Sequence, residues 1–234
     1  KVCYNRSMKE EKYLSLIDGS FADEFGQFAR LLTEYNKICN LTSVTDSKGV
    51  NYKHFFDSIA GESLFFHGAE IAEIGSGGGF PSIPLKIIRE DLKFTLIEST
   101  GKKCRFLQSV VDSLQLKCVQ VENIRAEDGA HDIIYREKFD FAVARAVAQL
   151  NILCEYCMPY VRVGGRFVAY KGECGEELKN AERAVKTLGG EIEKVIPYSL
   201  PEDYGQRNLV VIKKTENTPP LYPRGHGKER KQPL

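Results

Sequence analysis

The sequence lacks a long apolar stretch. It contains no run of about 18 consecutive apolar residues, the length that a helix needs to cross a membrane. Its first residues also lack the short apolar core that a secretory signal carries. We therefore expect neither a membrane-spanning segment nor a signal peptide, and no membrane partner.

The chain also has little net charge. Lys and Arg number 33 against 32 Asp and Glu, which leaves a formal net charge of +1. A global positive field is thereby excluded as the basis of nucleic-acid binding, while a local basic patch stays open. The seven cysteines are an odd number, and without a secretory signal this count favours a reducing compartment. We expect a cytoplasmic protein, and a monomer.

No metal-ligand spacing is evident. Cys154 and Cys157 have Cys-x-x-Cys spacing, but they fall inside a predicted helix and no second pair of ligands accompanies them. We interpret them as buried thiols. The histidines form no metal-ligand pattern either; they are His54, His67, His131 and His226. The sequence predicts no metal site.

Short apolar runs alternate with helical segments from residue 67 onward. This alternation predicts an α/β fold of the Rossmann-like kind, with a mostly parallel seven-stranded sheet. The last two runs have no helix between them, which predicts an antiparallel hairpin at one edge. Strands are expected at 71–74, 94–97, 119–121, 139–144, 166–170, 192–196 and 209–213, and helices at 84–89, 103–114, 150–156 and 176–188.

Two further segments flank this predicted core. Apolar residues from Phe21 to Tyr35 recur every three to four positions, and a second helix is expected around Tyr52–Phe66. We therefore expect an N-terminal helical extension (8–66) packed on a core (67–214). From residue 213 onward six Lys and Arg face two Glu, so residues 215–234 are expected to form a basic C-terminal arm. This arm either meets phosphates or is a solvated tail.

A glycine-rich loop follows the first predicted strand, in the segment Glu73-Ile-Gly-Ser-Gly-Gly-Gly-Phe80. Glycine is needed where a backbone turns sharply and a ligand approaches the main chain. A dinucleotide fingerprint needs a third glycine at the position of Phe80, which disfavours NAD. The pattern resembles the first motif of Rossmann-like methyltransferases, which bind S-adenosylmethionine (SAM). Glu73 would meet the SAM ammonium and Gly75, Gly77 and Gly79 would cradle the ligand; the alternative is a structural turn.

Polar residues follow three later strands. Glu98 ends the second strand, where a carboxylate can accept hydrogen bonds from a ribose diol; a solvated acid is the alternative. Ala126 and Glu127 follow the third strand, at the place where such folds meet adenine, and a plain polar loop is the alternative. Arg145 ends the fourth strand. It is placed over the transfer site as a positioning residue, unless it forms an ion pair with a neighbouring acid.

Taken together, these motifs resemble the RsmG (GidB) family of 16S rRNA guanine-N7 methyltransferases. The family often has Asp where Glu73 and Glu98 stand, and its tail differs around Gly225–Gly227. The matching segments cover nearly the whole chain in order: Tyr35–Thr42, His54–Ser58, Glu73–Pro84, Glu98–Lys103, Arg125–Glu127, Ala144–Ala146, Tyr170–Gly172 and Tyr222–Arg224.

The resemblance implies SAM as cofactor, with contacts from Gly75, Phe80, Ala126, Glu127 and Arg145. It implies ribosomal RNA or a small ribosomal subunit particle as partner, and N7 of a guanine as methyl acceptor. Two alternatives stay open: a SAM-dependent methyltransferase for another RNA, a protein or a small molecule, and a non-catalytic RNA-binding module that kept the fold. Candidate phosphate contacts, each of which is otherwise a solvated charge, are Lys37, Lys53, Lys102, Lys103, Arg105, Lys171, Arg207 and Arg224.

Overall fold

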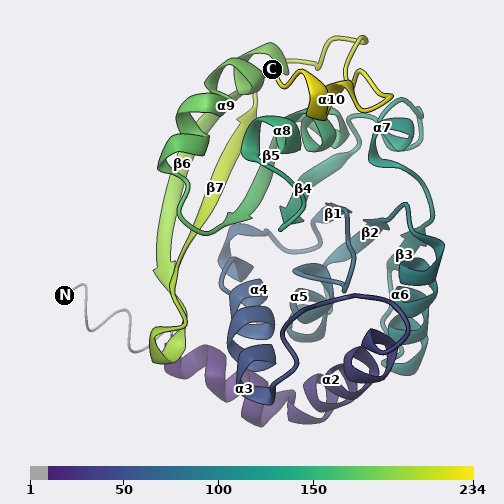
Figure 1. The fold of residues 1–234 in the computed structure, drawn as a ribbon, viewed down its shortest axis with the longest axis vertical. Coiled ribbons are helices and arrows are strands. Elements are labelled where there is room, and N and C mark those ends of the chain that lie inside the picture. Colours follow the sequence, from purple (N-terminus) through teal and green to yellow (C-terminus); the bar gives the residue numbers. More distant parts are fainter. Residues whose placement is uncertain (1–9) are drawn as a thin grey trace.

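The computed structural model describes residues 10–234 and contains one seven-stranded sheet with helices on both faces (Figure 1). The strand order is β3-β2-β1-β4-β5-β7-β6. The first five strands are parallel, while β7 is antiparallel to both β5 and β6. The predicted Rossmann-like architecture and its antiparallel edge hairpin are thus confirmed. The strands are β1 (Glu70–Ile74), β2 (Lys93–Ile97), β3 (Val119–Glu122), β4 (Phe139–Arg145), β5 (Val161–Lys171), β6 (Gly190–Ser199) and β7 (Gln206–Lys214).

Alternating side chains of each strand build two hydrophobic cores, one on each face of the sheet. Along β4, Phe141 and Val143 belong to one core, and Ala142 and Ala144 belong to the other. This follows because successive residues of a strand point to opposite faces. A strand covered on both faces is continuously apolar, which is why these runs stood out in the sequence. The core helices are α5 (Ser82–Ile88), α6 (Gly101–Ser113), α7 (Ala126–Gly129), α8 (Leu150–Cys157) and α9 (Gly175–Thr187), with short turns η4 (Met158–Tyr160) and η5 (Pro201–Asp203).

The N-terminal helices pack on the same face as α5 and α6. Phe25, Phe28 and Phe55 share the core of that face with residues of β1, β2 and β4. Residues 10–15 are helical. The later elements are η1 (Leu16–Ser20), α2 (Ala22–Asn36), α3 (Ser47–Gly49), η2 (Val50–Phe56), α4 (Asp57–Ile59) and η3 (Glu62–Leu64).

The second N-terminal helix differs from the prediction of Tyr52–Phe66. Helical structure runs through α3, η2 and α4, so it starts at Ser47 and ends at Ile59. The early start has a cap, because the Asp46 side chain accepts a hydrogen bond from the Gly49 backbone N–H at 2.7 Å. Just past the end, a side chain at Gly61 would lie 2.5 Å from the Tyr170 hydroxyl.

The C-terminal segment, residues 215–234, is packed against the core and ends near α8 and α9 (Figure 1). It contains a short helix, α10 (Lys228–Lys231), and buries Thr218 and Glu229. The sequence predicted an irregular arm here, because the segment has four prolines and few apolar residues. Polar contacts hold it on the core, and no local sequence pattern indicates them. Within residues 10–234 no helix is both long and apolar enough to span a membrane.

Candidate functional site

The glycine loop between β1 and α5 has a backbone that requires glycine at two places. Gly75 and Gly79 have φ values of +71° and +81°, which side-chain-bearing residues rarely adopt. A Cβ on Gly75 would lie 2.8 Å from Val147, and a Cβ on Gly79 would lie 2.6 Å from Ile83. The loop is therefore held tightly against the β4–α8 turn on one side and against α5 on the other.

Glu98 ties this loop to the end of β2. Its Oε2 accepts a hydrogen bond from the Gly77 backbone N–H at 3.0 Å, and its Oε1 accepts one from Thr100 N–H at 2.8 Å. The residue is buried. Each carboxylate oxygen has a second lone pair, so Glu98 can still accept hydrogen bonds from a ligand. The two acceptors point to the same end of the sheet as the loop.

A cavity of 420 Å³ opens at the carboxyl ends of β1, β2 and β3; we call it the glycine-loop cavity. This is where open α/β sheets bind ligands, next to the point between β1 and β4 at which the strand order reverses. Four residues predicted for the cofactor line it, Gly75, Glu98, Ala126 and Glu127, and so does Lys103, which the sequence predicted as a phosphate contact. Lining residues that the sequence did not suggest include Ile97, Ser99, Ile124, Val147, Tyr156 and Arg230.

Other predicted residues lie just outside this lining. Gly77 and Gly79 shape the loop, and the Phe80 ring turns toward the N-terminal helices, 5.4 Å from the Phe28 ring. Glu73 is buried below the loop, and within residues 10–234 neither of its carboxylate oxygens has a hydrogen-bond partner. Burial raises the pKa of Glu73 to about 8, although Ser82 and Arg145 oppose that shift. A buried carboxyl of this pKa is mainly protonated at neutral pH, and it can ionise against a cationic ligand group.

A second cavity, of 380 Å³, lies beside the first, at the carboxyl ends of β4 and β5; we call it the arginine cavity. Ala146 lines both cavities, so the β4–α8 turn separates them. The arginine cavity is lined largely by polar side chains, among them Lys53, His54, Asp57, Arg145, Lys171, Glu177 and Arg207. Two adjoining cavities with one shared wall can hold two reactants side by side.

Arg145 is fixed by several contacts from the N-terminal helices. Its Nη1 donates to Asp57 Oδ2 at 2.8 Å and to the Lys53 carbonyl at 2.9 Å. The Arg145 guanidinium lies 4.7 Å from the centre of the Phe80 ring. The Arg145 and Asp57 side chains are 11% and 6% exposed, so this ion pair is largely shielded from water. The ion pair that the sequence left as an alternative exists, and Arg145 also lines the cavity.

His54 completes the wall and is held neutral. Its ring stacks on Phe80 at 4.5 Å between ring centres. Arg145 Nη2 lies 3.2 Å from His54 Nδ1. Nδ1 also lies 3.1 Å from the Lys53 carbonyl, and Nε2 lies 2.7 Å from Thr42 Oγ1, so both ring nitrogens have a partner. Burial and the neighbouring Arg145 lower the pKa of His54 to about 3. His54 therefore serves as a neutral, fully engaged wall residue.

The predicted phosphate contacts fall into three groups. Lys171 and Arg224 have carboxylate partners: Lys171 Nζ is 2.6 Å from Glu177, and Arg224 pairs with the buried Glu155 at 2.7 Å. Arg207 lines the arginine cavity, with Nε 3.8 Å from Asp57. The others keep more of their charge in solvent: Lys37, Lys102 and Arg105 are exposed, and Lys53 and Lys103 are partly exposed.

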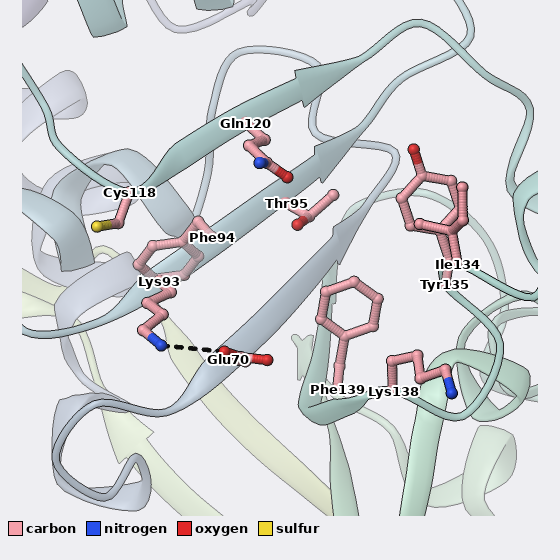
Figure 2. Close-up of a pocket in the computed structure, with 10 residues that line it drawn as sticks. All are labelled: Glu70, Lys93, Phe94, Thr95, Cys118, Gln120, Ile134, Tyr135, Lys138 and Phe139. Atoms are coloured by element: carbon pink, nitrogen blue, oxygen red, sulfur yellow. Dashed lines mark hydrogen bonds and ion pairs between the residues drawn. The ribbon is translucent and has the colours of Figure 1, made fainter.

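A further cavity of 470 Å³ lies at the opposite end of the sheet (Figure 2). Lys93 and Phe139 come from the amino ends of β2 and β4, and an ion pair of 3.0 Å joins Lys93 to Glu70 there. None of the residues predicted for the site lies in it. Ligands of such sheets bind at the carboxyl ends of strands, so we place the functional site in the two cavities described above. Within residues 10–234 no cluster of three or more potential metal ligands occurs, and Cys154 and Cys157 are both buried.

The sequence resembles one family throughout. The family model described as rRNA small subunit methyltransferase G matches residues 22–210. A curated protein of that description from Brevibacillus brevis is 48% identical over 215 residues, which cover 91% of this chain and 90% of that protein. Another, from Geobacillus thermodenitrificans, is 41% identical over 98% of this chain and 97% of that protein.

Solved structures share the fold at low sequence identity. Precorrin-6y C5,15-methyltransferase from Geobacter metallireducens superposes with a TM-score of 0.50 at 12% identity, over 75% of this chain and 92% of that chain. P. horikoshii TYW2 in complex with MeSAdo gives a TM-score of 0.53 at 14% identity, over 68% of this chain and 61% of that chain. These likenesses concern the fold alone.

Proposed function

The chain belongs to the rRNA small subunit methyltransferase G family, and from this premise we propose that it methylates N7 of a guanine in 16S ribosomal RNA. As a member of this family it is a SAM-dependent methyltransferase. The observation that carries the proposal is the pair of adjoining cavities with Ala146 as their shared wall. We assign SAM to the glycine-loop cavity and the target guanine to the arginine cavity.

The residues of the glycine-loop cavity fit SAM. Glu73, which lies next to this lining, is a buried carboxyl that we propose meets the ligand's ammonium, and Glu98 keeps free lone pairs for a ribose diol. Gly75 lets the ligand approach the backbone, and Ala126 with Glu127 forms the far wall, where adenine is expected. When bound, SAM supplies a methyl group on a positively charged sulfur.

Guanine N7 carries a free lone pair at neutral pH, so its methylation requires no general base. The arginine cavity agrees with this chemistry, because its histidine is engaged and does not hold a free proton-accepting position. Arg145 acts as a positioning residue: with its neighbour His54 it forms the wall against which the base is held, and Phe80 packs behind both side chains. Rate enhancement then comes from alignment of the two reactants and exclusion of water.

The RNA must present its guanine outside a regular duplex, because the deep major groove of double-stranded RNA hides N7 from side chains. Exposed lysines that include Lys37 and Lys102 are proposed to contact phosphates. We propose a monomeric cytoplasmic enzyme that meets ribosomal RNA or a small-subunit particle. All the cysteines within residues 10–234 are free thiols, which supports a reducing compartment.

The experiment is mass spectrometry of ribosomal RNA nucleosides from a strain that lacks this protein. Loss of one 7-methylguanosine from 16S rRNA, restored by the wild-type chain, supports the proposal. Unchanged rRNA with loss of a methyl group from another RNA, a protein or a small molecule would assign the enzyme to that substrate. Unchanged methylation everywhere would favour a non-catalytic RNA-binding role.

A further inference from the structure

The C-terminal segment, residues 215–234, lies beside α8, and its helix α10 is next to α8 (Figure 1). Arg224 forms three hydrogen bonds with the buried Glu155 of α8: its backbone N–H and Nε donate at 2.9 Å, and its Nη2 donates at 2.7 Å. The segment is also held from the α7 side, where His131 Nε2 lies 2.7 Å from the Pro223 carbonyl. We call these contacts of Arg224 and Pro223 with the core the clamp. Because α10 begins only three residues beyond the clamp, the core fixes its position.

The clamp brings Arg230, in α10, to the glycine-loop cavity. Arg230 lines this cavity together with Tyr156, which comes from α8. Burial raises the pKa of the Tyr156 hydroxyl, and the nearby Arg230 guanidinium opposes part of that shift. We propose that Arg230 is a SAM-binding residue, so that the C-terminal segment forms part of the cofactor site.

The neighbours of Arg230 identify the part of the ligand that it meets. Tyr156 lies close enough to Glu127 for that carboxylate also to influence its pKa. The adjacent Ala126 is fixed by its carbonyl, which accepts a hydrogen bond from the Tyr160 hydroxyl at 2.8 Å. This is the α7 end of the cavity, opposite the loop that receives the amino-acid moiety, and we assign it to adenine. A planar guanidinium stacks well on an aromatic face and keeps its charge.

This assignment differs from the role that the sequence suggested for the arm. A basic, proline-rich tail predicts contact with RNA phosphates, and such a contact would not change cofactor affinity in the absence of RNA. A guanidinium that lines the cofactor cavity would change cofactor affinity even without RNA. The inference rests on the proposed SAM site, and binding of SAM to the wild-type protein tests that site separately.

The test is calorimetry without RNA on the wild type, Arg230→Ala, Arg230→Lys and Lys231→Ala. Lys231 is an exposed residue of the same short helix and is the matched control. The two probes are SAM and 5′-methylthioadenosine, which lacks the amino-acid moiety. Since a stacked cation contributes about 0.5–2 kcal/mol, Arg230→Ala should raise both dissociation constants roughly 2- to 30-fold. Arg230→Lys should lie between, and Lys231→Ala should stay within about 2-fold.

Three results would overturn the inference. Unchanged affinity of Arg230→Ala for SAM, while the wild type binds it, would remove Arg230 from the site and leave the proposed function standing. A weaker affinity for SAM alone, with 5′-methylthioadenosine unaffected, would contradict the adenine assignment. An equal effect in Lys231→Ala would show that the change is not specific to Arg230. Absence of SAM binding by the wild type would instead count against the proposed function.

Discussion

Arg145 at the end of β4 and Asp57 at the start of α4 form an ion pair, 2.8 Å between Nη1 and Oδ2, in which both side chains are largely buried. The two residues are 88 positions apart in the sequence. Asp57 also accepts a hydrogen bond from the Tyr198 hydroxyl of β6 at 2.7 Å. One carboxylate thus joins the N-terminal helices, the end of β4 and the antiparallel hairpin behind the arginine cavity.

We expect Asp57→Asn to lower the free energy of unfolding by about 3 kcal/mol or more. Removal of one partner leaves the other charge buried and uncompensated, which costs roughly 3–5 kcal/mol. Urea unfolding measures the change. The matched control is Glu70→Gln, which breaks the exposed pair with Lys93 and should cost less than about 1 kcal/mol. Similar losses of stability in the two variants would show that the Asp57–Arg145 ion pair stabilises the fold no more than an exposed ion pair does.

We expect Glu73→Gln to stabilise the ligand-free protein at high pH. The folded-state pKa of about 8 lies above the ordinary value of 4.5, so folding favours the protonated carboxyl. As the pH rises from about 4.5 to about 8, the wild type loses stability that Gln does not lose. Urea unfolding near pH 5 and near pH 9 should show a gain that is small at the lower pH and larger at the higher one.

The same variant should bind SAM more weakly, because Gln offers no charge to the ligand's ammonium. Calorimetry at pH 8 checks this. Equal stability of wild type and variant across the pH range would contradict the buried, unpaired state of Glu73, and unchanged SAM affinity would contradict its ligand role.

Glu98→Ala should weaken SAM binding by about 1.5–3 kcal/mol, the range for hydrogen bonds that involve a charged group. The variant removes the acceptor for the Gly77 N–H as well as the proposed ribose contact. Calorimetry gives the affinity, and circular dichroism checks that the fold persists. A change below about 0.5 kcal/mol would make Glu98 a structural acid only.

Lys102→Ala should make RNA binding less sensitive to salt. Removing one lysine–phosphate interaction with a single strand makes the slope of log affinity against log salt shallower by roughly 0.7. Lys194, an exposed residue of the edge strand β6, is the control, and its replacement by Ala should leave the slope unchanged. If both variants keep the wild-type slope, Lys102 is a solvated charge.

The sequence predicted the sheet well because strands such as β4 contain continuous apolar runs, and the glycine pattern indicated the ligand loop between β1 and α5. Ser99 and Val147 lie next to residues of the predicted motifs, so the same reasoning could have placed them at the site. Contacts between distant segments could not be predicted in this way. Nothing in the sequence around Asp57 indicates that it pairs with Arg145. The same holds for Arg230, because long-range contacts such as the Arg224–Glu155 pair bring the tail to the cavity.

The central claim is that the two adjoining cavities transfer a methyl group from SAM to N7 of a guanine in 16S rRNA. The most direct measurement incubates the purified protein with methyl-labelled SAM and 16S rRNA or small subunits from a strain that lacks the protein, followed by nucleoside mass spectrometry. The account predicts label in 7-methylguanosine at one position of the 16S rRNA. Label in a different nucleoside, or none in rRNA from a protein that binds SAM, would contradict it.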